Sequence, residues 1–270
     1  MMGDGRAEGV AIVTGAAGGM GSACARKLAA EGWDEFLLCD IHAGRLESLA
    51  DDLRAGGAQV DVLAGDVADP GWADALLAAL GSRKISALIH TAGLAPMMAD
   101  APRILVVNLD ATVALVDAVR DRMAAGSAAV LYASNSTYFP MPPEAAEAFT
   151  SPLPPGGTAQ LAHLAPVPEL AYPLSKLGVR ALVKREAKSF GDRGSRLISV
   201  SPGAIDTPMT KDEIPNSEPA QKMIRDSASG RIGRPEEVAA VSVFLCSPEA
   251  SFAVATDWLV DGGHTAAMGF

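Results

Sequence analysis

The chain has 270 residues, of which 49% are hydrophobic, enough for one large α/β domain whose core needs neither a metal nor a disulfide. Its net charge is −10 without a cluster of Lys and Arg, which argues against nucleic acid or an anionic membrane as a partner. The cysteines Cys24, Cys39 and Cys246 fall in apolar segments at no metal-ligand spacing, so we expect buried free thiols and no metal site.

The first residues, MMGDGRAEG, lack the basic and then apolar layout of a signal peptide. No apolar stretch approaches the ~18 residues that a membrane-spanning helix needs. We therefore expect a cytoplasmic protein without a membrane partner.

Short apolar runs alternate with longer segments of helical period along most of the chain. The expected strands cover residues 9–14, 35–40, 59–66, 85–93, 128–134, 196–203 and 255–260. The expected helices cover residues 20–32, 43–57, 70–81, 104–123, 174–190 and 235–247, and a polar loop is expected from Asp206 to Gly230. Such β-α repeats predict an α/β fold of the Rossmann type, with a doubly wound, parallel, seven-stranded sheet and helices on both faces. Residues 1–270 are predicted to form a single domain.

Residues 139–170 have a different texture and are predicted to be an insertion. They hold eight prolines, which exclude a long helix or a central strand across this stretch. Short helical pieces are expected at residues 144–149 and 159–165.

A glycine-rich loop, TGAAGGMG, runs from Thr14 to Gly21 between an expected strand and an amphipathic helix. A turn in this place admits a pyrophosphate close to the backbone and directs it to the helix N-terminus. A glycine turn without a ligand is the alternative interpretation. The loop residues predicted to bind a dinucleotide are Gly15, Ala17, Gly19, Met20 and Gly21.

Asp40 ends the second apolar run, where a dinucleotide-binding fold places an acid that accepts the adenosine ribose hydroxyls. An acid there repels a 2′-phosphate, and no Arg or Lys stands at Gly18, Ile41 or His42 to neutralise one. We therefore expect NAD(H) in preference to NADP(H), with Asp40 and Ile41 at the adenosine. The alternative is that Asp40 only caps the helix that starts at Ala43.

Tyr172 and Lys176 stand four residues apart in AYPLSK, one helical turn from each other. A nearby ammonium favours the phenolate and lowers a pKa that starts near 10. The phenol can then act as an acid or base near neutral pH. Together with the glycine loop, this pair indicates hydride chemistry on a nucleotide cofactor.

The ordered motifs resemble the short-chain dehydrogenases/reductases of the non-extended type over nearly the whole chain. The matches are Thr14 to Gly21, Asp40, Asp66-Val67, Ala92-Gly93, Asn108, Ser134, Tyr172 to Lys176, Pro202-Gly203 and Asp261 to Gly263. Each of these residues, taken alone, could have an ordinary structural role. Their occurrence together in this order favours functional roles in an NAD-dependent oxidoreductase.

The resemblance implies roles for the matched residues. Tyr172 would exchange a proton with the substrate oxygen, and Lys176 would lower the tyrosine pKa and hold the nicotinamide ribose. Ser134 would hydrogen-bond the reacting oxygen, although Ser136 would face the same side of a continued strand. Asn108 would anchor a water that links the lysine to solvent. The further positions implied to bind the cofactor are Asp66 and Val67 at the adenine, Ala92, Gly93, Pro202 and Gly203, and Ile205 and Thr207 at the carboxamide.

Several features depart from the common family pattern. His90-Thr91 stands where most members have two Asn residues, and we interpret His90 as a core or strand-end histidine instead of a proton-transfer residue. Pro173 directly follows Tyr172, so we expect the helix to begin there.

The spacings resemble the 3α-hydroxysteroid dehydrogenase/carbonyl reductase branch, because 14 residues separate Gly93 from Asn108 and 37 separate Ser134 from Tyr172. In that branch the insertion covers the helix face through which most relatives form tetramers. The last helix and strand are left to form a dimer. A homodimer is therefore expected, and a tetramer remains possible.

The expected walls of the substrate pocket are mostly apolar and rich in Met, which adapts to irregular shapes. They are Leu94, Pro96, Met97, Met98, Tyr138, Phe139, Met141, Met209, Ile214, Met223 and Ile224. This favours the interconversion of a bulky alicyclic or aromatic, steroid-like secondary alcohol and its ketone. The alternatives are a dehydrogenase for a ring diol or hydroxylated catabolic metabolite, and a non-catalytic NAD sensor. Retention of Ser134, Tyr172 and Lys176 argues against the sensor.

Overall fold

The structure is a computed structural model that describes residues 7–154, 156–208, 210 and 218–270. Its centre is a seven-stranded parallel sheet with the strand order β3-β2-β1-β4-β5-β6-β7. The strands are β1 Val10–Thr14, β2 Glu35–Asp40, β3 Gln59–Ala64, β4 Ile85–His90, β5 Met123–Tyr132, β6 Arg196–Pro202 and β7 Asp257–Val260. This confirms the predicted doubly wound sheet. The order reverses between β1 and β4, which places a crevice at their carboxyl ends.

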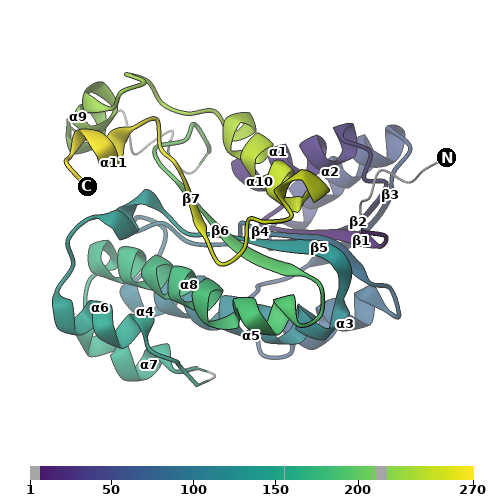
Figure 1. Cartoon of the computed structure of the whole chain (residues 1–270), viewed down its shortest axis with the longest axis horizontal. Coiled ribbons are helices and arrows are strands. Elements are labelled where there is room, and N and C mark those ends of the chain that lie inside the picture. The colour runs from purple at the N-terminus through teal and green to yellow at the C-terminus, as the bar shows by residue number, and fades with distance from the viewer. Residues whose placement is uncertain (1–6, 155, 209, 211–217) are drawn as a thin grey trace.

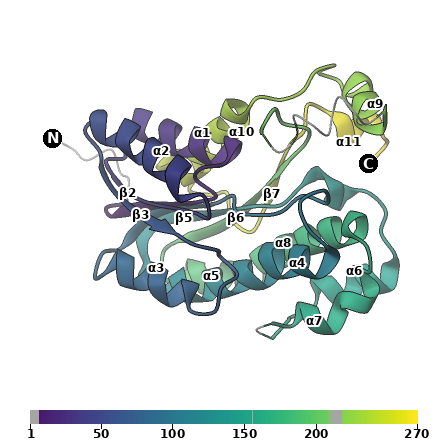
Figure 2. The same ribbon diagram turned by 180° about the vertical axis from the view of Figure 1, so that it is seen from behind.

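Helices cover both faces of the sheet (Figures 1 and 2). One face carries α1 Gly19–Ala30, α2 Ala43–Ala55 and α10 Pro235–Cys246, and the other carries α3 Trp72–Leu80, α4 Ala101–Leu105, α5 Ala111–Val119 and α8 Pro168–Gly191. Alternate residues of β1 enter the two cores: Val10 and Ile12 pack towards α3, α5 and α8, whereas Ala11 and Val13 pack towards α1, α2 and α10. The sheet is thus buried on both faces.

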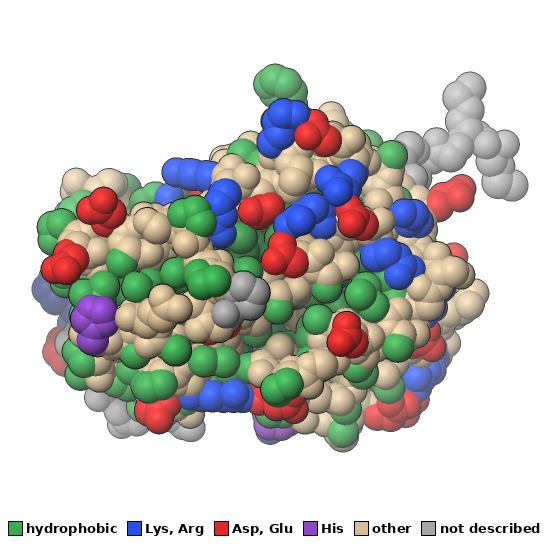
Figure 3. All heavy atoms as spheres, turned by 90° about the horizontal axis from the view of Figure 1, so that it is seen from below, with side chains coloured by type: hydrophobic (Ala, Val, Ile, Leu, Met, Phe, Trp, Pro, Cys, Tyr) green, Lys and Arg blue, Asp and Glu red, His purple; other side chains and the backbone are tan. Residues whose placement is uncertain are grey.

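The insertion folds into two short helices, α6 Pro143–Thr150 and α7 Thr158–Leu161, followed by a 3-10 turn at Ala162–Leu164. These helices lie beside α8 and α4 (Figure 1). Gly178 of α8 permits the close approach, because a Cβ there would lie 2.6 Å from Leu109 Cδ2 and 3.1 Å from the Phe149 carbonyl oxygen. On the face that Figure 3 shows, Lys and Arg side chains are interspersed with Asp and Glu side chains. The insertion covers part of α8 through its helix α6.

The prediction that the long helix begins at Pro173 is wrong. The helix α8 begins at Pro168 and contains Pro173. Pro168 occupies the first helical position, where no backbone N–H is needed, while Pro173 leaves one carbonyl of the first turn without its helical donor. The upstream residues still form a helical turn because Ala171 and Leu174 pack into the core.

Two other expected elements differ from the structure. The segment expected as a polar loop from Asp206 to Gly230 contains a helix, α9 Glu218–Asp226. The helix expected at residues 104–123 is interrupted by a π-helical turn at Val106–Asp110 and ends in a 3-10 turn at Arg120–Arg122. The remaining short elements are 3-10 turns at Asn135–Tyr138 and Pro248–Ala250 and the helix α11 His264–Ala267. Within the described ranges, no helix is long and apolar enough to cross a membrane.

Candidate functional site: a dinucleotide cleft and a buried lysine

The glycine loop forms a tight turn between β1 and α1. Gly15 has a φ of +67°, and a Cβ on Gly21 would lie 2.1 Å from the Gly15 carbonyl oxygen. Helix α1 is capped by Gly18, with no side-chain cap among the described residues and no acid in its first turn. Its first N–H groups and the positive end of its dipole are therefore available to an anion. This turn fits the pyrophosphate of a dinucleotide.

A cleft of about 590 Å³ opens beside this turn at the carboxyl ends of the strands. The predicted cofactor residues that line it are Gly15, Ala17, Gly19, Met20, Gly21, Asp40, Ile41, Asp66, Val67, Ala92, Gly93 and Thr207. The structure therefore brings together most of the cofactor positions that the sequence predicts.

Asp40 lies at the end of β2 and is 8% exposed. Its Oδ2 accepts a hydrogen bond from Ala17 N at 2.9 Å, and its Oδ1 accepts one from His42 N at 2.9 Å. Neither bond caps α2, whose N-cap is His42. Each oxygen retains a lone pair for a hydroxyl group at the cleft, so Asp40 is held in place to accept two hydroxyls.

Two arginines that the sequence analysis did not select also line this cleft. Arg45 comes from the first turn of α2, and Arg103 comes from α4. Arg103 forms an ion pair with Asp66, whose other carboxylate oxygen accepts a hydrogen bond from Ala68 N at 2.9 Å. The carboxylate of Asp66 is thus already engaged. Arg103 lies in the short segment between Gly93 and Asn108.

Helix α8 carries Tyr172 and Lys176 on adjacent turns. Lys176 is 6% exposed, and its Nζ donates a hydrogen bond to the Tyr132 carbonyl oxygen at 2.9 Å. Burial lowers the pKa of Lys176 to about 8. Burying this ammonium at the end of β5 costs folding free energy, because a buried charge without a partner is strongly unfavourable. The hydrogen bond to the Tyr132 carbonyl offsets part of that cost.

Asn108 and Gly93 place Lys176 directly behind the cleft. The Asn108 side chain accepts from Leu94 N at 2.7 Å and donates to the Leu94 carbonyl at 3.0 Å and to Ser175 Oγ at 3.2 Å. A Cβ on Gly93 would lie 3.1 Å from Asn108 Oδ1 and 3.2 Å from Lys176 Nζ. A glycine here therefore lets the backbone approach the lysine closely, whereas a larger residue would require Asn108 or Lys176 to shift by a few tenths of an ångström.

Ser134 follows β5 and begins a 3-10 turn. Its Oγ accepts from Ser136 N at 3.1 Å, and Thr137 Oγ1 donates to its carbonyl at 2.7 Å. Because the chain turns here, Ser134 and Ser136 do not share the face of a continued strand. Arg180, one turn after Lys176, donates to Thr137 Oγ1 at 2.8 Å and fixes the turn against α8.

The remaining predicted residues lie around this centre. Thr207 sits over the glycine loop, since a Cβ on Gly19 would lie 2.8 Å from Thr207 Cγ2. Gly203 packs against Asp261, and Pro202 ends β6. The cleft lining in the described part of the chain does not include Asn108, Ser134, Tyr172, Lys176, Pro202, Gly203 or Ile205.

The expected substrate walls are only partly assembled at the cleft. Leu94, Met97 and Met98 line it, and Met97 and Met98 are 71% and 51% exposed. Phe139 instead packs against the rings of His264 and Phe270, at 5.4 Å and 5.6 Å between centroids. Met209 and Ile214 lie outside the described residues.

Comparisons with known proteins agree with this geometry. Residues 9–146 match the family described as short chain dehydrogenase, and residues 159–265 match that described as enoyl-(acyl carrier protein) reductase. The chain belongs to the short-chain dehydrogenase/reductase family. It is an oxidoreductase of a family that binds nicotinamide cofactors and includes alcohol dehydrogenases.

Three similar proteins carry specific names. The chain is 33% identical to a cis-4-hydroxycyclohexanecarboxylate dehydrogenase of Sinomonas cyclohexanicum, over 98% of this chain and 100% of that protein. It is 32% identical to a D-threitol dehydrogenase of Mycolicibacterium smegmatis, over 95% and 92% of the two chains. A crystal structure of the 3-alpha-hydroxysteroid dehydrogenase from a Pseudomonas species, complexed with NADH, superposes with a TM-score of 0.78 at 28% identity and covers 96% of this chain and 98% of that one.

Proposed function

We propose that the protein is an NAD(H)-dependent dehydrogenase that interconverts a bulky alicyclic or aromatic secondary alcohol and its ketone. The observation that carries this proposal is the buried ammonium of Lys176 behind Gly93, at the inner end of the dinucleotide cleft. A buried charge next to a cofactor cleft is a marker of a functional site.

In this proposal Tyr172 is the acid and base. During oxidation Tyr172, as the phenolate, would take the proton of the alcohol. A nicotinamide bound in the cleft would supply the redox chemistry by accepting the hydride of the carbinol carbon. The positive charge of Lys176 stabilises the phenolate, and Ser134 hydrogen-bonds the reacting oxygen. Asn108 holds the Gly93–Leu94 wall and Ser175 in place beside the lysine.

The preference for NAD(H) is supported by Asp40. Its two carboxylate oxygens are aligned by backbone donors at the adenosine end of the cleft and suit the two ribose hydroxyls. A 2′-phosphate would place negative charge beside this carboxylate, and we infer that NADP(H) binds less tightly.

The apolar cleft residues and the names of the relatives support a cyclic alcohol as the substrate. Leu94, Met97, Met98 and Val107 offer an apolar and adaptable wall. One relative is named for a hydroxycyclohexane acid and a structural neighbour for a hydroxysteroid. A ring diol or another hydroxylated catabolic metabolite is the second candidate, since a third relative is named for a polyol.

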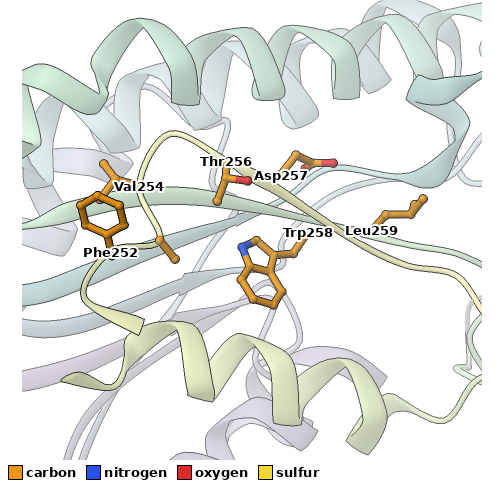
Figure 4. Close-up of a pocket in the computed structure, with 7 residues that line it drawn as sticks. Phe252, Val254, Thr256, Asp257, Trp258 and Leu259 are labelled. Atoms are coloured by element: carbon orange, nitrogen blue, oxygen red, sulfur yellow. The ribbon is translucent and has the colours of Figure 1, made fainter. Parts of the chain in front are cut away.

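We also propose that the protein is a homodimer through β7 and α10, with a tetramer as the alternative assembly. β7 is an edge strand, and Phe252, Val254, Trp258 and Leu259 line a shallow hollow beside it (Figure 4). Phe252 is fully exposed, and Trp258 packs edge-on against Phe244 of α10 at 6.0 Å. Exposed apolar groups of this kind mark association surfaces.

The buried free thiols support a reducing, cytoplasmic location.

Tyr172→Phe tests the proposed chemistry. We expect turnover to fall by about 100- to 10,000-fold, since the general acid and base is lost, while NADH binding stays near that of the wild type. Turnover is followed by the absorbance of reduced nicotinamide with a panel of cyclic alcohols, ketones, diols and steroids, and NADH binding by calorimetry. Lys188→Met, an exposed substitution in the same helix, is the control and should retain most activity. An active Tyr172→Phe enzyme contradicts the assignment, whereas a wild type that binds NADH but converts no substrate favours the sensor.

A further inference from the structure

The ring of His90 contacts both the glycine loop and helix α5, which follows Asn108. It ends β4, next to Thr14 at the end of β1, and is 3% exposed. Its Nδ1 lies 2.6 Å from Thr14 Oγ1, the first residue of the glycine loop, and its Nε2 lies 2.9 Å from Thr112 Oγ1 in α5. The ring therefore connects the cofactor loop to the helix that follows Asn108.

The direction of these hydrogen bonds follows from the next contact. Thr112 Oγ1 lies 2.8 Å from the Asn108 carbonyl oxygen, and two oxygens at that distance require a hydrogen between them. The carbonyl has none, so the single hydroxyl hydrogen of Thr112 points to Asn108. Towards His90 the Thr112 oxygen can only accept, and His90 Nε2 must carry the ring hydrogen.

The other ring nitrogen then accepts. In the neutral ring with a hydrogen on Nε2, Nδ1 is bare and receives the hydroxyl hydrogen of Thr14. Burial and, to a smaller extent, the nearby charge of Lys176 lower the pKa of His90 to about 3, so the ring stays neutral over the working pH range. Three hydrogen bonds thus run in one direction, from Thr14 through His90 and Thr112 to the Asn108 carbonyl.

The end of this chain is the part of the site that positions the lysine. Asn108 lies in the π-helical turn Val106–Asp110, and such turns are frequent at functional sites. Its carbonyl is held by Thr112, while its side chain holds Leu94 and Ser175 and lies against Gly93, next to Lys176 Nζ. A rotation of this turn would therefore move Gly93 and the surroundings of the lysine.

We propose that His90, fixed as its Nε2–H tautomer, is a positioning residue that aligns the Asn108 turn and Lys176 with the glycine loop that binds the cofactor. This inference rests on the proposed dehydrogenase function. His90 takes no part in proton transfer, because it neither touches the substrate cleft nor changes its charge. It acts through Thr112 and Asn108.

A matched pair of substitutions separates the two arms of the ring. The amide of a Gln reaches the place of Nε2 and can donate to Thr112, whereas the amide of an Asn reaches only the place of Nδ1 and contacts Thr14. We expect His90→Gln to retain kcat within about threefold, and His90→Asn to lower it about tenfold, the effect of losing one buried hydrogen bond. The Kd of NADH, measured by calorimetry, should change little in either variant.

Substitutions of Thr112 test the same chain from its other end. Thr112→Val should lower kcat about as much as His90→Asn, Thr112→Ser should restore it, and the double variant His90→Asn/Thr112→Val should be no slower than the worse single variant. Equal kcat values for the Gln and Asn variants, or additive losses in the double variant, would overturn the proposal. The proposal would also be overturned if the loss of kcat simply followed the loss of thermal stability across all variants.

A direct reading of the tautomer does not depend on turnover. In ¹⁵N NMR spectra of the whole protein, the His90 resonances, assigned by their loss in His90→Gln, should show a neutral ring with the hydrogen on Nε2 from pH 5 to 9. A hydrogen on Nδ1, or titration in this range, contradicts the proposal. If the wild type converts no alcohol but shows the Nε2–H tautomer, the proposed function fails and the hydrogen-bond chain stands.

Discussion

Lys176→Met should stabilise the folded protein while it removes activity. Lys176 is buried, and its pKa in the folded state is about 8, against an ordinary value of 10.5. Below pH 8 the folded state must hold the charge in a place that disfavours it. The difference of about 2.5 pH units corresponds to about 3 kcal/mol of lost folding free energy. Met keeps the apolar stem of the side chain and has no charge to bury.

The gain is reduced by the hydrogen bond that Lys176 makes. Without Nζ, the Tyr132 carbonyl oxygen loses its donor at 2.9 Å, which costs about 1 to 3 kcal/mol in a buried place. We therefore expect Lys176→Met to raise the free energy of unfolding at pH 7 by about 1 kcal/mol. Turnover should fall to background, since the phenolate of Tyr172 loses its cation.

The pH dependence separates this explanation from a simple packing effect. Between pH 8 and 10.5 the unfolded wild type binds more protons at Lys176 than the folded state does, so wild-type stability rises with pH in this window. The difference between Lys176→Met and the wild type should fall by about 1.4 kcal/mol per pH unit there. Urea unfolding at pH 7, 8, 9 and 10 measures it, with the exposed Lys188→Met of the same helix as the control. A difference that does not change with pH would refute the reasoning.

Three other substitutions test separate parts of the site. Asp40→Ala should weaken NADH binding about 10- to 100-fold and relax the rejection of NADPH, because Arg45 stays at the cleft; unchanged selectivity in calorimetry contradicts the role of Asp40. Gly21→Ala should abolish NADH binding, since its Cβ would meet the loop backbone, whereas Gly44→Ala, which has free space, should not. Asp257→Asn should lower the free energy of unfolding in urea by about 1 to 2 kcal/mol, because it removes the charge that attracts Arg180 and accepts from Tyr138 in a partly buried place.

Most residues that line the cleft could be selected from the sequence because they are encoded locally. The glycines of the first loop and the acid at the end of β2 stand at fixed offsets from apolar strands, and parallel strands bring their carboxyl ends to one edge. Lys176 could be selected for its spacing from Tyr172. The burial of Lys176, and hence its lowered pKa, depends on Tyr132 and Gly93, which come from distant segments.

The parts that the sequence did not predict depend on contacts between distant residues. The start of α8 at Pro168 needs the packing of Ala171 and Leu174, which overrides the local preference against a proline inside a helix. Helix α9 was missed because a segment rich in charged and polar residues was read as a loop, although its Lys222–Asp226 pair has helical spacing.

The turn after Ser134 shows why the substrate half of the site is the harder half to read. Arg180 from α8 donates to Thr137 and lies 4.1 Å from the centroid of the Tyr138 ring, and Tyr138 donates to Asp257 of β7 at 2.7 Å. Three segments separated by dozens of residues thus fix one short turn, and no local motif encodes that arrangement. Asp257 also belongs to the proposed dimer edge, so in that dimer assembly through β7 would be linked to the placement of Ser134 through Arg180 and Tyr138. The placement of Ser134 therefore depends on tertiary contacts that relatives with the same motifs need not share.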